Sequence, residues 1–272
     1  MYFLNKTKKA FTMIELVFVI VILGIVASIS SELIAKVYGQ YIVQRAQHRS
    51  AIKTELAASQ IENRFNSAIP NTVYRIKFDG TYESIETASG TGDDYIGIQW
   101  IGADSESFST ASTPGWSGFC DLNDSDKSQI NTDGSQLSMT DAIISYLYNG
   151  KTIVDSAVFF PNQYEEHNIS GRTGEEQLNF DNTGTKTIAE QYKLAWSSYA
   201  LIVENGDLYL YYNFEPSIKK DYTSNSQKAL LLKNVTTFKF KGDGGTLRFK
   251  ICKSERISED VNLTSCKEKA VF

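Results

Sequence analysis

The chain has 272 residues and a formal net charge of −5, with 42% hydrophobic and 22% charged residues. These fractions exclude a wholly disordered chain, because disordered chains hold too few apolar residues to bury. The first ten residues contain three lysines and no acid, so the remainder is more acidic than the whole. We therefore expect no general nucleic-acid binding, since an acidic surface repels phosphate.

An apolar run follows this basic start. Residues 11–31 contain one charged residue, Glu15, and as a helix these 21 residues would be about 31 Å long. That length matches the hydrocarbon core of a bilayer and exceeds the apolar core of a secretory signal peptide. Because the lysines precede the run, the N-terminus is predicted to stay cytoplasmic while the remainder crosses. We therefore expect a membrane anchor.

Glu15 is costly in such an anchor. A charged side chain inside the apolar run costs roughly 2.5–3.5 kcal/mol even on the most lenient insertion scale. One partner is local: Thr12 and Glu15 have the spacing of a capping box, in which the carboxylate accepts a backbone N–H at the helix start. The other candidate is a positive group from a neighbouring chain. The residues alone leave both open.

The residues around Glu15 resemble the processing site of type IV prepilins. The similarity covers about residues 6–34 and rests on two basic residues, a small residue, a phenylalanine and a Thr-x-x-Glu-Leu pattern: Lys8, Lys9, Ala10, Phe11 and residues 12–16. The resemblance implies that a prepilin peptidase cuts between Ala10 and Phe11, and that Phe11 is N-methylated. It also implies that Glu15 pairs with the Phe11 amine of an adjacent subunit. Ala10 stands where the family usually has glycine.

The resemblance also implies a function and a location. The chain is expected to be a structural subunit of a type IV pilus, a type II secretion filament or a competence filament. Its partners would be other pilin subunits, the prepilin peptidase, the inner-membrane assembly platform and membrane lipid. The anchor would lie in the inner membrane with a periplasmic head, which reaches the filament or the exterior after assembly. The large head resembles that of a minor pilin or a J-type pseudopilin. The alternative is a filament-tip binding module for adhesion, substrate or DNA capture on the same anchor.

The anchor helix is predicted to continue as an amphipathic helix over residues 32–67. No proline lies between residue 11 and Pro70, so one spine over residues 11–67 is expected. Apolar residues recur at helical spacing and predict a face that packs on a sheet: Ile34, Val37, Tyr38, Tyr41, Ile42, Ile52, Leu56, Ile61 and Phe65.

Residues 71–272 are predicted to form a β-rich head, which makes the fold class α+β with a leader at residues 1–10. The expected early elements are three strands and one short helix capped by Thr-Asp: Val73–Phe78, Tyr95–Ile101, Ser156–Phe160 and the helix Thr140–Tyr148. Residues 161–187 read as a polar loop.

Two hairpins are predicted late in the chain. The first joins Tyr199–Val203 to Leu208–Phe214 through Asn205-Gly206, a dipeptide typical of two-residue turns. The second joins Val235–Lys241 to Thr246–Lys253. Together they are expected to form one antiparallel meander over the amphipathic helix.

Two of the three cysteines are expected to pair. Cys252 and Cys266 are 14 residues apart, and a disulfide between them would stabilise the head by about 3 kcal/mol in an oxidising compartment. The pilin resemblance supports this pairing, because many pilins close a C-terminal loop in this way. The alternative is two reduced, buried thiols. Cys120 is predicted to have no partner.

Little in the sequence indicates a cofactor or catalysis. Asp121, Asp124 and Asp126 form an oxygen-rich cluster that would suit calcium, although the spacing is not that of an EF-hand and a solvated acidic loop is the alternative. No other metal or cofactor is predicted. The two histidines, His48 and His167, lie in no metalloprotease, nucleophile-elbow or phosphate-loop motif. We therefore expect that the protein is not an enzyme.

Overall fold

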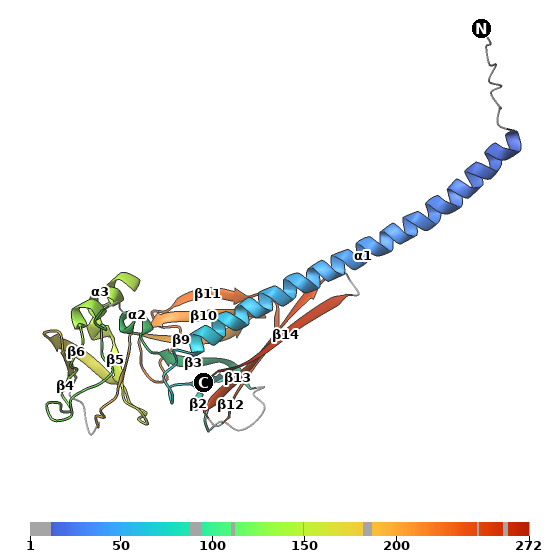
Figure 1. The fold of residues 1–272 in the computed structure, drawn as a ribbon. Coiled ribbons are helices and arrows are strands. Elements are labelled where there is room, and N and C mark those ends of the chain that lie inside the picture. Colours follow the sequence, from blue (N-terminus) through green and yellow to red (C-terminus); the bar gives the residue numbers. More distant parts are fainter. Residues whose placement is uncertain are drawn as a thin grey trace, which may run out of the picture.

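One long helix and three antiparallel sheets make up the computed structural model, which describes residues 12–87, 94–109, 112–148, 150–181, 187–243, 245–257 and 261–271. Helix α1, Met13–Phe65, has 53 residues and is therefore about 80 Å long. Its N-terminal part projects away from the strands as a free rod, and its C-terminal part lies along them (Figure 1). The predicted α+β fold is confirmed.

The boundaries of α1 agree with the predicted spine to within two residues. Thr12 is its N-cap and Asn66 its C-cap, and the chain turns away before Pro70. Phe11 lies outside the described residues. The division of the chain into a leader over residues 1–10 and a head over residues 71–272 stays a prediction.

The largest sheet has six strands in the order β11-β10-β9-β3-β1-β2. Their bounds are β1 Tyr74–Lys77, β2 Tyr82–Ser84, β3 Tyr95–Gly102, β9 Ser197–Glu204, β10 Asp207–Phe214 and β11 Gln227–Leu232. The predicted β9–β10 hairpin is confirmed. Its turn residues Asn205 and Gly206 have φ values of 51° and 80°, the left-handed region that these two residue types tolerate best.

A separate three-stranded sheet, β12-β13-β14, contains the second hairpin. Its strands are β12 Val235–Asp243, β13 Thr246–Arg256 and β14 Asn262–Val271. The prediction of one continuous meander is therefore wrong. Strand β11 pairs with β10 at the edge of the larger sheet, so the chain reaches β12 only after that sheet has ended. Strand β14 was not predicted, because most of its residues are polar and exposed.

The third sheet, of five strands, lies in the part of the head farthest from the free end of α1 (Figure 1). Its order is β4-β7-β6-β5-β8. The bounds are β4 Gln129–Asn131, β5 Ala157–Phe159, β6 His167–Thr173, β7 Gln177–Phe180 and β8 Lys193–Ala195, with helices α2 Ser105–Phe108, α3 Leu137–Leu147 and η1 Ile153–Asp155 beside it.

In this region the predicted loop is wrong, whereas the predicted short helix is present with a different start. The supposed loop over residues 161–187 contains the β6–β7 hairpin, because Ile169, Leu178 and Phe180 alternate with polar residues and enter a buried core. Helix α3 begins at Leu137, three residues before the predicted Thr-Asp cap. Leu137 is fully buried, and this burial favours a helix that starts on the N-terminal side of Thr140.

The C-terminal part of α1 packs on the six-stranded and the three-stranded sheets, but mostly not through the predicted apolar face. Ile61 and Phe65 are buried as predicted, whereas Ile52 and Leu56 are 45% and 58% exposed. The remaining buried positions are small residues: Ser50, Thr54, Ala57 and Ala58. Small side chains let the helix axis approach the strands closely, so the contact face lies to one side of Ile52 and Leu56.

Candidate assembly site

The start of α1 places Glu15 against its own helix terminus. The Thr12 backbone N–H and the Thr12 hydroxyl each donate to Glu15 Oε2, both at 3.4 Å, in the pattern of a capping box. Oε1 accepts no hydrogen bond from the residues that the structure describes, and the side chain is exposed. The local partner is therefore present, and it leaves half of the carboxylate available to a second group.

The free part of α1 is apolar on all sides. Every large apolar side chain from Met13 to Ile42 is between 49% and 90% exposed. Burying one such side chain stabilises a protein by about 1.5–3 kcal/mol, so this rod is poorly suited to water. The helix is long and apolar enough to span a membrane, and it lies near the N-terminus. Lipid or other helices are the environments that suit it.

A charged seam fixes the lower part of α1 to the three-stranded sheet. Lys267 of β14 lies 2.5 Å from Glu55 of α1, and Lys269 lies 2.8 Å from Glu62. The hydrogen bond to Glu62 raises the pKa of Lys269. Since these side chains are exposed to solvent, water screens each pair and its contribution to stability is small. Their main effect is to fix the direction in which the free rod leaves the head.

A second part of the seam lies one to two helical turns before Glu55, nearer the free end of α1. Arg49 of α1 donates to Glu255 of β13, and Lys253 contacts the same carboxylate at 3.2 Å. Burial raises the pKa of Glu255, but the hydrogen bonds from Arg49 and Lys253 outweigh it and hold this pKa below its ordinary value. Sequence patterns did not predict the seam, because its partners are about two hundred residues apart in the chain.

The disulfide predicted between Cys252 and Cys266 is present in the same sheet. The two residues face each other directly across β13 and β14, so the bond crosslinks the strands that contact α1 rather than closing an irregular loop. Cys120 is a free, buried thiol that donates to the Ala189 carbonyl at 3.0 Å. Burial raises the pKa of Cys120, which makes it a poor nucleophile.

The three aspartates of the possible calcium loop serve different local structures. Asp121 accepts the Asn123 N–H at 2.8 Å, and Asp126 accepts the Ser128 N–H at 2.7 Å, so each closes its own turn. Asp124 borders a depression that Glu175 and Glu176 also line. Within the described ranges, no three His, Cys, Asp or Glu side chains form a metal-binding group. Calcium binding stays a prediction that this geometry does not test.

Comparison with known proteins identifies the N-terminal segment. The family model described as the prokaryotic N-terminal methylation motif matches residues 5–31. The matched range contains Ala10, Phe11, Thr12 and Glu15, of which Ala10 and Phe11 lie outside the described residues. Searches of curated proteins and of solved structures give no match. The chain therefore carries a type IV pilin-like prepilin segment. This segment supports the interpretation of the protein as a type IV pilin-like subunit. The motif implies processing by a prepilin peptidase and assembly with other pilin subunits.

Proposed function

We propose that this protein is a minor pilin or J-type pseudopilin, a structural subunit of a type IV pilus, a type II secretion filament or a competence filament. The observation that carries the proposal is the free apolar rod of α1 with a single carboxylate, Glu15, in its first turn. This rod packs against no other part of the chain that the structure describes. Packing against the rods of other subunits, or against lipid, supplies a partner.

Processing would give Glu15 its second partner. A cut between Ala10 and Phe11 creates a new amine at Phe11, four residues before Glu15. The Phe11 amine of an adjacent subunit would approach the free Oε1, while Oε2 keeps its contacts with Thr12. At 4 Å and an effective dielectric constant near 20, such a pair interacts by about 4 kcal/mol, which is comparable to the cost of placing the carboxylate in the membrane.

The topology follows from the same features. Lysines precede the span, so the head would lie in the periplasm and the short N-terminus in the cytoplasm, beside the prepilin peptidase and the assembly platform. The disulfide between Cys252 and Cys266 supports this placement, because disulfides persist in oxidising compartments. After assembly the head would face the outside of the filament.

Mass spectrometry of the mature chain, combined with a filament assay, tests the proposal. We expect an N-terminus at methylated Phe11. In Glu15→Val, filament incorporation should fall about tenfold or more, because losing an ion pair of this strength exceeds the 1.4 kcal/mol that corresponds to tenfold. An uncut chain, or a cut elsewhere, would contradict the prepilin assignment.

Two matched variants separate pairing from helix capping. Glu32→Gln removes a carboxylate from the same helix, one that pairs with Lys36 on the next turn, and should assemble normally. Thr12→Ala weakens the capping box but keeps the carboxylate. If Thr12→Ala reduces incorporation as much as Glu15→Val, capping is the role of Glu15 and the pairing proposal is wrong.

A second function, a binding module at the filament tip, is favoured by one observation, a cleft between the C-terminal end of α1 and the five-stranded part of the head.

A further inference from the structure

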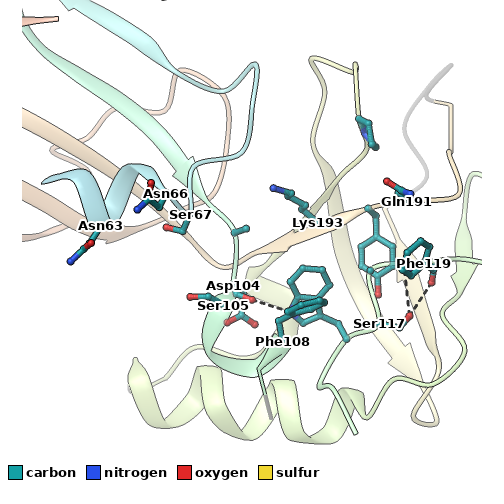
Figure 2. A pocket seen from close by; sticks show the side chains of 15 residues that line it. Asn63, Asn66, Ser67, Asp104, Ser105, Phe108, Ser117, Phe119, Gln191 and Lys193 are labelled. Atoms are coloured by element: carbon teal, nitrogen blue, oxygen red, sulfur yellow. Dashed lines mark hydrogen bonds between the residues drawn. The ribbon is translucent and has the colours of Figure 1, made fainter. Parts of the chain in front are cut away.

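A cleft of about 560 Å³ opens where the C-terminal end of α1 meets the five-stranded part of the head. Figure 2 shows its walls: the end of α1 with Asn63 and Asn66, the α2 segment with Phe108, and the strand that carries Lys193. The volume lies within the range of small-molecule sites. The cleft begins at Asn63, 21 residues along α1 from Ile42 at the end of the exposed apolar rod, so it lies outside that rod.

Aromatic rings line one side of the cleft. Phe108 and Phe119 are 45% and 54% exposed, so both rings are accessible from solvent. Trp116 packs against Phe108 with ring centroids 4.7 Å apart and against Tyr192 at 5.7 Å. Phe108, Trp116 and Tyr192 thus form a contiguous apolar platform that is open to solvent at Phe108, and Phe119 adds a second exposed ring to the lining.

The platform is held rigidly. Trp116 Nε1 donates to the Asp104 carbonyl at 3.2 Å, and the Ser117 N–H donates to Ser135 Oγ at 2.8 Å. Gly118 has a φ of +79°, which favours glycine, and a Cβ there would lie within 3.7 Å of both Trp116 and Phe108. These distances are ordinary van der Waals contacts, so it is the left-handed backbone, and not the space, that favours glycine at this position.

The polar lining consists mostly of amides and hydroxyls, with one acidic and one basic side chain. Asn63, Asn66 and Gln191 are exposed and present amides to the cleft. The only charged side chains among the described lining residues are Asp104 and Lys193. Asp104 is buried and accepts hydrogen bonds from the Ser107 N–H and hydroxyl, and burial raises the pKa of this carboxyl. One cation is too few for a polyanion such as nucleic acid.

The backbone around the cleft is already paired. The Tyr192 N–H donates to the Gly118 carbonyl at 2.9 Å, and the Asp104 N–H donates to the Leu194 carbonyl at 2.8 Å. An extended peptide commonly binds by adding a strand to an open sheet edge, and these bonds occupy the edge that borders the cleft. The site thus offers ring faces and side-chain amides, while these backbone groups are not available to hydrogen-bond an added peptide strand.

We propose that this cleft binds a saccharide, with the C–H face of a sugar ring on Phe108 and Phe119 and its hydroxyls on Asn63, Asn66, Gln191 and Lys193. Sugars combine an apolar ring face with a neutral rim of hydroxyl groups, and the cleft presents the complement of both. The assignment goes beyond the filament role and stands independently of it.

A glycan array probed with the full-length chain tests this assignment. The chain is held in a detergent without a sugar headgroup, because glycosidic detergents would compete for the cleft. Glycans retained on the array are then titrated calorimetrically. We expect binding, and about a tenfold loss of affinity in Phe119→Ala, which removes one exposed ring. Phe78→Ala is the control, since Phe78 is 71% exposed and does not line the cleft.

Asn66→Ala provides a second variant at an exposed position, should Phe119→Ala fail to fold. Binding of no glycan by the folded chain would overturn the proposal. Unchanged affinity in both Phe119→Ala and Asn66→Ala would also overturn it, because the sugar would then bind elsewhere. Both variants should be cut at Phe11 and enter filaments normally, so this result is separable from the test of the filament role.

Discussion

Truncating Phe65 should uncouple α1 from the six-stranded and the three-stranded sheets. Phe65 is fully buried, and its ring lies 4.3 Å from that of Trp100 in β3 and 6.0 Å from that of Phe249 in β13. A buried aromatic side chain removes about 150–250 Å² from water, which at about 25 cal/mol per Å² corresponds to roughly 4–6 kcal/mol. Alanine keeps a small part of this, so Phe65→Ala should lower the free energy of unfolding by about 3–5 kcal/mol. That is a large fraction of the 5–15 kcal/mol typical of a folded domain.

The assay is urea unfolding of the full chain in mild detergent, followed by tryptophan fluorescence, to which the adjacent Trp100 contributes. Leu56→Ala is the matched control, because the periodicity of the sequence assigns both residues to one face while the structure leaves Leu56 58% exposed. We expect Leu56→Ala to cost less than about 1 kcal/mol. If both variants lose equal stability, the packing face of α1 described above is wrong.

Three further predictions concern the strands. Gly97→Ala should prevent the β3–β9 pairing, because its Cβ would lie 2.1 Å from the Leu201 carbonyl oxygen. Gly171→Ala is the control, since its Cβ meets nothing closer than 4.0 Å. Circular dichroism and thermal melting distinguish the two variants, and equal melting temperatures would contradict the register of β3 on β9. Cys252→Ser should lower the free energy of unfolding by about 3 kcal/mol, and a reductant should destabilise the wild type but not the variant. The pKa of Glu255 is lowered, so its contribution is complete above its ordinary value of 4.5 and is lost as the pH falls through the folded pKa. The stability difference between the wild type and Glu255→Gln should therefore shrink on acidification from pH 6 to pH 3 in thermal melts, and a constant difference would refute the pairing with Arg49.

Local patterns predicted the elements whose signals lie within a few residues. The span of α1 follows from an unbroken apolar run without proline, and the β9–β10 hairpin follows from Asn205-Gly206 between two apolar strands. Strand β14 is not predicted because its polar residues have a weak local preference for a strand. Its pairing with β13, which no local pattern specifies, compensates for that weak preference. The β6–β7 hairpin was missed for the same reason.

The sequence by itself determined the apolar start of α1, the position of Glu15 and the match to the methylation motif, because each depends on consecutive residues of one helix. Only the tertiary structure decided which face of α1 packs, since that depends on how closely small residues such as Ala58 let it approach two sheets. The seam between α1 and the three-stranded sheet and the cleft near Phe119 were decided in the same way. Both join residues far apart in the chain, so no local pattern specifies them.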